Sequence, residues 1–479
     1  MDAYKVIGDN PLGSKAYDVL APFVGEQFGL EGISAAADAL EVAFNKAGFS
    51  FHRVNIPPQE LMSGFVTLEI LRFHIGEVQI SGNEYYDIGN IRRSVPNLES
   101  KQTPNTIALS EAVKWANKNA SKKLVLRFKE SEEPNAINAE LNVSDRDPQM
   151  FFVSLDNSGG YNSESARMTL GYQNGNVLNK DHSMTLTVTT APKDTDLATQ
   201  FGLSYQIPYY SNLSRLNLLF SDSESNSGTV ADNNLVTGKG SVLGATYTKT
   251  YFSTNNLEHN VSVGFMYKLF DNEIVGTTSK VLSFPLELSY GLLYSGSQSL
   301  LTANFSLASN MESGDDNNDA TYGYARSGAT SEWSASRYRF SWDYAFIQNW
   351  MIHADLSGQI TNNILIPGEL FGVGGSSTLR GFEERYINGD EGVRTRVELW
   401  GPSFYQVRWL VFADNAHIEN NNGAISDDVA SLGLGFRWSW KTDLNLSLDI
   451  GRITDSGDSD TTVNKKDDTK THFSLVYRF

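Results

Sequence analysis

The chain has 479 residues, no cysteine and a formal net charge of −18. Its length allows two to four ordinary domains, or a pair of small domains followed by one large barrel. The lack of cysteine excludes disulfides, thiolate nucleophiles and cysteine-ligated metals. It also suits an oxidising compartment, where a protein without thiols cannot mispair. The acidic balance argues against a general nucleic-acid role, because phosphate binding needs a basic face.

The sequence contains no apolar run that approaches the ~20 residues of a membrane helix, and its mean hydropathy is −0.32. A closed β-barrel can still cross a bilayer, because it satisfies its own backbone and needs only alternate apolar positions. Met1-Asp2-Ala3 leads directly into a strand-like stretch at 4–7, with no signal peptide before it. An exported protein would need one, so we expect a processed or truncated form.

The first part of the chain, up to about Asp147-Pro148, alternates helical and strand patterns and resembles a duplicated unit. The offset between the copies is about 74 residues, judged from Gly8 against Gly82. Two tandem copies form an elongated arm, and such pairs more often bind polypeptide chains than catalyse a reaction. Each copy is expected to have the order β-α-α-β-β, an α+β unit.

The expected elements follow the apolar periodicity and the turn residues. In the first copy they are a strand at 4–7, a turn at 8–11, a helix with Ile33, Ala37, Leu40 and Phe44 on one face that closes at Gly48, and strands at 51–56 and 66–72. In the second copy they are a strand at 77–80, a turn at 82–83, a short helix at 87–94, a longer helix marked by Leu109, Val113 and Ala116, and strands at 124–128 and 139–143.

The second part, from Pro148 to Phe479, is composed of strand and turn patterns. Met184, Leu186 and Val188 alternate with threonines, and the same alternation recurs at 301–307 and 444–450. The partners of the apolar residues are small or polar, which is typical of a lipid-facing barrel with a wet lumen. The strands of a soluble β-sandwich also alternate in this way, so the pattern alone does not exclude a β-sandwich. Strands of ~10 residues with their turns use ~20 residues each, so the length suggests about sixteen strands.

The chain ends on a strand with Phe473, Leu475, Tyr477 and Phe479 on one face. Soluble proteins seldom end on a bare aromatic strand. In a barrel the last strand must pair with the first, so no frayed tail follows it. The C-terminus therefore favours a barrel.

Together with a glycine-rich stretch at 371–375, these features resemble the transporter half of a two-partner secretion system, the hemolysin-activator type of outer-membrane protein (TpsB family). The resemblance spans essentially the whole chain. The residues that carry it are Asn55-Ile56-Pro57-Pro58-Gln59 with Gly64, Tyr86, Asn90-Ile91-Arg92-Arg93-Ser94, Pro104-Asn105, Asp145 to Pro148, Asp156 to Gly159, Gly374-Gly375, Leu379-Arg380-Gly381-Phe382 and Gly389-Asp390-Glu391-Gly392.

The resemblance implies an outer-membrane pore. It implies two tandem polypeptide-transport-associated (POTRA) domains in the periplasm, at 1–73 and 74–146, and a transmembrane antiparallel β-barrel of sixteen strands at 147–479. A loop near 366–392 is expected to fold back into the lumen. Members usually begin with a helix that plugs the pore, but here the first repeat begins almost at Met1. That helix has been removed or is absent from this protein, and without it the resting pore should be more open.

In the family, the sixth extracellular loop carries an arginine that pairs with an acid on the barrel wall. The motif Leu379, Arg380, Gly381, Phe382 places that arginine at 380. Arginine suits the role because its permanent charge and planar fork bind a carboxylate bidentately. The segment 412–416 resembles the family's Phe-x-Asp-x-Gly, so Asp414 is the expected partner, although Ala416 replaces the final glycine. Secondary candidates are Glu398, Asp427 and Asp428.

The resemblance also assigns partners. The POTRA domains are expected to bind a secreted exoprotein, with Pro58, Gln59, Arg92 and Arg93 as the candidate residues. Tyr477 and Phe479 resemble the C-terminal signal that the barrel assembly machinery recognises. The exported partner could be an adhesin, a hemolysin or a contact-dependent toxin. Acidic runs at 315–319 and 455–460 are interpreted as solvated loop tips, or as sites for divalent cations at a lipopolysaccharide surface.

No enzyme signature was found. The sequence lacks a Gly-x-Ser-x-Gly elbow, a His-Glu-x-x-His motif and the Gly-Lys-Ser/Thr of a phosphate-binding loop. We therefore expect no catalytic residue, cofactor or metal site. Two other functions remain: an assembly factor of the same superfamily, which usually has three to five repeats, and a passive porin, which lacks the repeats.

Overall fold

The computed structural model describes all residues except 1–2, 26–28, 61–63, 161–164, 194, 196–197, 226–228, 231–233, 236–237, 275–276, 424 and 459–463. The last of these gaps contains residues 459–460 of the acidic run at 455–460. The chain forms two compact units. The first comprises Met1–Pro148, Leu178–Asp181 and Tyr209–Leu213, and the second comprises Gln149–Val177, His182–Pro208 and Ser214–Phe479.

The first α+β domain has the expected order β-α-α-β-β. Its elements are β1 (Ala3–Gly8), α1 (Lys15–Leu20), α2 (Gly29–Lys46), β2 (His52–Asn55) and β3 (Phe65–Arg72), with a 3-10 turn η1 at Ala21–Phe23. The sheet order is β1-β3-β2, with β1 parallel to β3. Helix α2 buries its apolar stripe against the sheet, as its 3–4 residue spacing predicts. The buried residues of α2 are Ile33, Ala36, Ala37, Leu40 and Phe44.

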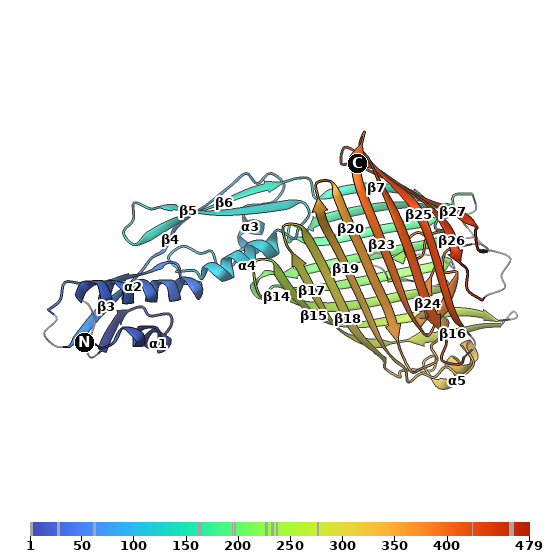
Figure 1. Cartoon of the computed structure of the whole chain (residues 1–479), viewed down its shortest axis with the longest axis horizontal. Helices are drawn as coiled ribbons and strands as arrows, with labels where there is room; N and C mark the ends of the chain where they lie inside the picture. The colour runs from blue at the N-terminus through green and yellow to red at the C-terminus, as the bar shows by residue number, and fades with distance from the viewer. Residues whose placement is uncertain are drawn as a thin grey trace. The chain divides into compact units, whose positions relative to one another are not determined.

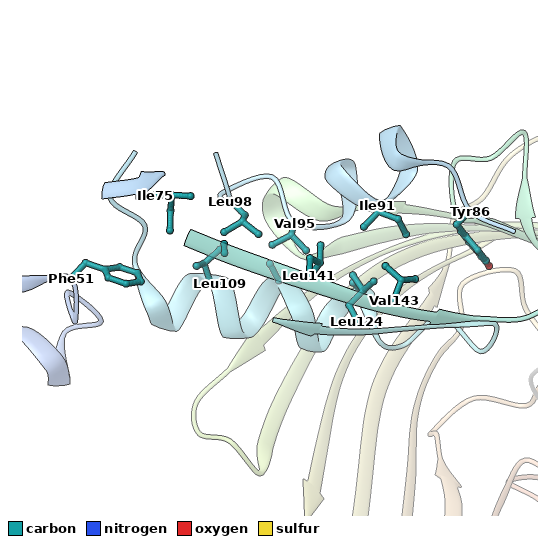
Figure 2. Close-up of a cluster of buried hydrophobic side chains, with 13 residues drawn as sticks. Phe51, Ile75, Tyr86, Ile91, Val95, Leu98, Leu109, Leu124, Leu141 and Val143 are labelled. Carbon is teal, nitrogen blue, oxygen red and sulfur yellow. The ribbon is translucent and has the colours of Figure 1, made fainter. Parts of the chain in front are cut away.

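The second α+β domain repeats this order. Its elements are β4 (His74–Ser81), α3 (Ile88–Ser94), α4 (Thr106–Ala116), β5 (Lys122–Glu130) and β6 (Ala136–Asp145), in sheet order β4-β6-β5. Asp87 and Asn105 cap α3 and α4 by accepting hydrogen bonds from the first-turn N–H groups. Figure 2 shows the core, whose residues include Ile75, Ile91, Leu109, Leu124 and Leu141.

Two glycines confirm the duplication physically. Gly8 is the last residue of β1 and Gly82 directly follows β4, and both have positive φ, +90° and +84°. A Cβ at either position would lie 2.4 Å from a carbonyl oxygen of the neighbouring strand, Ile70 or Val143. Glycine is therefore required at both sites for backbone conformation and for close approach.

The two domains meet end to end at helices α2 and α4, which both belong to the first unit. Carbonyls at the C-terminus of α2 accept from the N-terminus of α4, Asn105 Nδ2 to Ala47 O at 2.9 Å and Thr106 N to Gly48 O at 2.8 Å. The negative end of one helix thus faces the positive end of the next. Phe51 also packs into the core of the second domain (Figure 2). These contacts couple the two domains.

The first unit contains a buried ion pair that the sequence did not reveal. Lys122 Nζ lies 2.6 Å from Asp181 Oδ2 and also donates to Asn90 Oδ1 at 2.9 Å and Ser94 Oγ at 2.7 Å. Tyr210 donates to the same carboxylate at 2.6 Å. Burial lowers the pKa of Lys122, against the opposing attraction of Asp181. The three N–H groups of the lysine ammonium thus have three acceptors, as a buried charge requires.

The second unit is a closed antiparallel β-barrel (Figure 1). β16 and β17 both pair with β15, so they form one interrupted strand, and the described residues build sixteen strands, as predicted. The strands are β7 (Gln149–Asp156), β8 (Arg167–Val177), β9 (His182–Thr190), β10 (Thr199–Tyr209), β11 (Ser214–Ser225), β14 (Gly238–Phe252), β15 (Leu257–Ile274), β16 (Thr277–Ser283), β17 (Pro285–Ser295), β18 (Ser299–Asn310), β19 (Ser334–Ile347), β20 (Trp350–Ile360), β23 (Glu391–Phe404), β24 (Val407–Glu419), β25 (Ser426–Trp440), β26 (Leu444–Asp455) and β27 (Thr469–Arg478).

The barrel closes between its first and last strands. β27 pairs antiparallel with β7 over Ser474–Arg478, and Phe151 and Phe479 exchange backbone hydrogen bonds at 3.0 Å and 2.9 Å. The Phe479 ring stacks on Phe151 with centroids 6.0 Å apart. The terminal aromatic therefore lies at the closing seam.

Loops at the two barrel ends differ in length. One end has short turns, such as 253–256 and 441–443, whereas the other has the segments 311–333 and 361–390. Outer-membrane barrels place short turns in the periplasm and long loops outside, so these two segments correspond to the extracellular loops of that class of barrel. The first carries helix α5 (Asp319–Ala325), which lies next to β16 (Figure 1). Within the described part of the chain, no helix is long and apolar enough to cross a membrane.

Candidate functional site

The long loop between β20 and β23 folds back along the inner wall of the barrel. Its limbs pair as a short hairpin, β21 (Phe371–Val373) with β22 (Ile387–Gly389). Gly374, Gly375 and Gly381 have positive φ, from +92° to +125°. A side chain at any of them would be strained, so the glycines let the hairpin bend tightly.

Arg380 at the tip of this loop is completely buried. Its Nε and Nη2 donate to Asp414 Oδ2 at 2.8 Å and Oδ1 at 2.7 Å, which is a bidentate pair. The backbone N–H of Arg380 also donates to Asp414 Oδ2 at 3.1 Å. Asp414 lies in the middle of β24, where alternate residues are buried and exposed. The loop tip therefore reaches the middle of the wall on its inner face.

Two further carboxylates of the wall surround the same guanidinium. Arg380 Nη1 lies 2.7 Å from Glu398 Oε1 on β23 and 3.9 Å from Asp449 on β26. The Glu398 contact is a close ion pair without the alignment of a hydrogen bond. Arg396 Nη2 donates to Glu398 at 3.2 Å, and Arg437 binds Asp449 through both Nη atoms at 2.8 Å and 2.9 Å. These pairs hold the wall carboxylates in place.

The cluster balances its formal charges. Three arginines, 380, 396 and 437, face three carboxylates, 398, 414 and 449. The guanidinium of Arg380 also lies 3.5 Å from the centroid of the Phe412 ring, a cation–π contact. Such an arrangement fixes the loop tip to the wall. Among the described residues, no group of three or more His, Asp or Glu side chains could hold a metal ion.

Close backbone approach and apolar packing complete the docking of the tip. The Gly381 N–H donates to His472 Nε2 at 3.0 Å, and a Cβ on Gly451 would lie 2.6 Å from Gly381 N. Leu379 and Phe382 are fully buried in one cluster with Ala416. The methyl group of Ala416, which replaces the family's glycine, is accommodated in this cluster.

The other two predicted acids do not meet Arg380. Asp427 Oδ1 accepts from the N–H of Asp458 at 2.8 Å, and Asp428 pairs with His417 Nδ1 at 3.0 Å at an exposed position. Both lie at the start of β25. They belong to the extracellular end of the wall.

The four predicted POTRA residues divide into two kinds. Pro58 and Arg92 are exposed. Gln59 is used inside its own domain, where its side chain donates to Thr67 O at 2.8 Å and accepts from Thr67 N at 2.6 Å. Arg93 donates to Asn179 O at 2.6 Å within the first unit.

Sequence reasoning missed Arg396, Arg437, Asp449 and His472. Their common signal is a charged or polar residue at an inward position of an alternating strand, as with Asp449 among Leu446, Leu448 and Ile450. In a lipid-facing barrel such positions point to the lumen. Which of them meet depends on strand register, and a single sequence does not specify register.

The chain was compared with known proteins. A family model described as "Haemolysin secretion/activation protein ShlB/FhaC/HecB" matches residues 136–438, and a model of the ShlB-type POTRA domain matches residues 2–72. No curated protein matches the chain.

Three solved structures show the same fold. CdiB from Escherichia coli has a TM-score of 0.81 at 15% identity, with 100% of this chain and 90% of that chain covered. CdiB from Acinetobacter baumannii has a TM-score of 0.77 at 15% identity, covering 100% and 89%. BamA from Haemophilus ducreyi lacking POTRA domains 1–3 has a TM-score of 0.55 at 16% identity, covering 100% of each chain.

The first family model covers more than half of the chain, and the POTRA model covers most of the first domain. Members of the family are secretion transporters of the outer membrane, not enzymes, and their POTRA domains are periplasmic. The sixteen-stranded barrel and its two N-terminal α+β domains agree with this. The chain belongs to the haemolysin secretion/activation protein (ShlB/FhaC/HecB) family and is an outer-membrane secretion pore.

Proposed function

We propose that this pore recognises and exports one large, β-rich exoprotein by two-partner secretion. The exoprotein is an adhesin, a hemolysin or a contact-dependent toxin. The observation that carries the proposal is the combination of two POTRA domains with a barrel whose lumen holds a loop docked through Arg380 and Asp414. The domain limits 1–73, 74–146 and 147–479 are part of the same proposal.

The sheet edges of the POTRA domains suggest how the partner is received. β5 is at one edge of its sheet. The side chain of Asn117 covers the outward backbone groups of Leu124, through Leu124 N to Oδ1 at 2.6 Å and Nδ2 to Leu124 O at 3.0 Å. Along an antiparallel strand, the backbone groups of every second residue point away from the paired strand. Leu126 and Phe128 therefore point their N–H and C=O groups outward, as Leu124 does. An extended segment can add to the strand there.

We assign β5 as the receiving strand. Val125 and Phe128 are 50% and 39% exposed. Strand addition draws affinity from the backbone and selectivity from side chains on either face. The exposed Pro58 and Arg92 are proposed to contact the partner directly, whereas the side chains of Gln59 and Arg93 are hydrogen-bonded within their own unit. A partner bound in this way is unfolded when it enters the barrel.

The direction of transport follows from folding. No nucleotide is available in the periplasm, so we propose that the partner threads through the barrel and folds outside. A partner folded on the far side cannot slide back, because folding removes the unfolded form from the equilibrium. Tyr477 and Phe479 serve the barrel assembly machinery when the pore is built, and the outer loops face lipopolysaccharide.

The alternative is an assembly factor that inserts other barrels into the membrane. The BamA fold is similar but matches less closely than the two CdiB folds, with a TM-score of 0.55 against 0.81 and 0.77. The chain also has two POTRA-like repeats, and assembly factors usually have three to five. Secretion is therefore the function that we favour.

The test compares Phe128→Pro with Phe128→Val. Both variants lose the edge-to-face contact of Phe128 with Phe51, but only proline removes the outward N–H, and an edge strand tolerates proline at such a position. Binding of an unfolded segment of a candidate exoprotein from the same bacterium is measured with the purified chain, and export is measured in cells.

We expect Phe128→Pro to weaken binding and export by about tenfold relative to Phe128→Val, which corresponds to one lost backbone hydrogen bond. Equal binding by the two variants would refute strand addition at β5. Failure of every exoprotein of that bacterium to leave the cell through the unaltered chain would refute the secretion proposal itself.

A further inference from the structure

The base of the in-folded loop carries a buried carboxylate, Glu369, eleven positions before Arg380. Its oxygens accept from Lys268 Nζ at 2.9 Å and 3.0 Å, from Ser283 Oγ at 2.8 Å and from Arg337 Nη2 at 3.0 Å. These donors come from β15, β16 and β19. The side chain of Glu369 is 1% exposed. Charge-assisted hydrogen bonds in a site that excludes water are strong.

The backbone at the base is also fastened. Gln359, near the end of β20, donates through Nε2 to the carbonyl oxygens of Glu369 at 3.0 Å and of Asp390 at 2.9 Å. One side chain thus joins both limbs of the loop. Gly368 packs so closely against the Phe270 ring that a Cβ would lie 2.3 Å from it. The base of the loop is therefore pressed against the wall at β15.

Arg326, which caps the C-terminus of α5, holds the same two limbs from the neighbouring loop. It binds Asp390 through both Nη atoms, with Nη2 to Oδ2 at 3.0 Å, and donates to Leu365 O at 2.7 Å. Asp390, which is completely buried, also accepts from Leu365 N at 2.7 Å and Asn421 N at 2.9 Å. The first and last parts of the loop are held together where they leave the strands.

These base contacts are separate from the tip contacts. The Glu369 side chain binds β15, β16 and β19, whereas Arg380 at the tip binds β23, β24 and β26, and β20, which carries Gln359, lies between the two sets in the sheet order. The apolar residues divide in the same way. Ile366 is buried in a cluster with residues of α5 and β16, and Leu379 is buried in another with residues of β24, β25 and β26.

We propose that Glu369 is a positioning residue that holds the base of the loop independently of Arg380. When Arg380 leaves Asp414, the tip at 371–389 moves, and the base at 361–370 stays attached to the wall. The loop then behaves as a tethered flap and does not leave the lumen as a whole. This proposal rests on the proposed secretion function in one respect, because secretion is what gives the tip a reason to move. The anchor at Glu369 is a feature of the pore without an exported partner.

The chain contains no cysteine, so a single introduced cysteine reports the accessibility of one position. Leu379→Cys reports on the tip and Ile366→Cys on the base, because both sites are buried. Each reporter is combined with Arg380→Ala, with Glu369→Gln, or with Glu332→Gln as the control. Glu332 is an exposed carboxylate in the neighbouring outer loop. The rate of labelling by a water-soluble maleimide is measured on the purified full chain.

We expect Glu369→Gln to accelerate labelling of Ile366→Cys by about tenfold or more, because two cations then face a neutral amide. It should change labelling of Leu379→Cys by less than about twofold, since distant anchors act independently. Arg380→Ala should do the reverse, and Glu332→Gln should do neither.

Equal acceleration of both reporters by either variant would show that the loop moves as one body and would overturn the proposal. Unchanged labelling of Ile366→Cys in Glu369→Gln would overturn it as well. If Glu369→Gln fails to fold, as judged by heat-modifiable mobility, Lys268→Met is used with the same expectation, because it removes one cation of the anchor from a partly exposed position. No exported partner is present, so the outcome does not depend on the secretion function.

Discussion

Replacing Arg380 by alanine should release the loop tip and leave the barrel folded. The change leaves Asp414 and Glu398 buried without their main cation, and removing one partner of a buried pair costs about 3–5 kcal/mol. Arg396 lies 3.7 Å from Asp414 and 3.2 Å from Glu398, so it offsets part of this and favours the lower end. About 3 kcal/mol shifts the ratio of docked to undocked loop by roughly 100-fold.

The assay is single-channel conductance in planar bilayers. We expect Arg380→Ala to give larger channels with frequent transitions, because an undocked tip no longer fills the lumen. Arg380→Lys should be intermediate, since it keeps the charge but loses the bidentate fork. Arg452→Ala is the control: its pair with Asp467 has both side chains 64% exposed, and such a pair contributes about 0–1 kcal/mol.

Channels of Arg380→Ala that match the unaltered chain in size and stability would refute this reasoning. Loss of the heat-modifiable, folded barrel in that variant would refute it in another way, because the arginine would then support the barrel itself. In both cases Arg452→Ala has to behave as the unaltered chain.

Three further predictions concern other parts of the molecule. Gly82→Ala should lower the unfolding midpoint of the helical circular-dichroism signal, by more than about 1 kcal/mol in stability, because it adds a clash 2.4 Å from Val143 O to the strain of φ +84°; Gly13→Ala, with positive φ and open space, should cost less. Burial lowers the pKa of His52, so below about pH 6.5 the unfolded chain takes up a proton that the folded domain resists. The free energy of unfolding should therefore decrease as the pH is lowered below that value. That slope should be absent in His52→Gln. Phe479→Ala removes a ring that stacks on Phe151 and Tyr477, and it should lower the fraction of heat-modifiable barrel formed in cells; an unchanged fraction would argue against a role of this residue in assembly.

The element order of the two POTRA domains could be predicted because its signals are local. The stripe that begins at Ile33, the cap residue Asp87 and the turn glycines 8 and 82 each act within a few residues of themselves. The pairing of the last strand with the first was predictable as well, because the C-terminal strand of a closed barrel can only pair with the first strand. These predictions needed no knowledge of distant contacts.

The surroundings of Arg380 were predictable only in part. The sequence motif pointed to Arg380 and Asp414, and Glu398 was a candidate without a rank that set it apart from Asp427 and Asp428. The choice among them depends on how far each strand is shifted against its neighbour. Glu398 is in the middle of β23, whereas the two aspartates are at the outer end of β25. The register of each strand is set by many weak pairings around the barrel, and it cannot be derived from a single sequence.

The buried anchors of Glu369 and Lys122 were not predicted for a related reason. In sequence, a lone glutamate or lysine is usually a solvated side chain. Lys122 becomes buried only when a turn that follows β8 brings Asp181 to it, 59 positions along the chain. Gln59 shows the opposite case: the motif identified it, but its amide is bound to Thr67, so its effect on a partner would be indirect.

Passage of an exported chain through the lumen of this barrel can be tested directly at two positions of β26. Ser447 and Leu448 are neighbours on β26 whose side chains point to opposite faces. Ser447 shares its face with Asp449, which lies beside the luminal Arg380. A photo-crosslinking residue is placed at each position in turn, in cells exporting a stalled exoprotein. We predict crosslinks from position 447 and none from position 448. Crosslinks from neither position, while export continues, or equally from both, would contradict passage through the lumen.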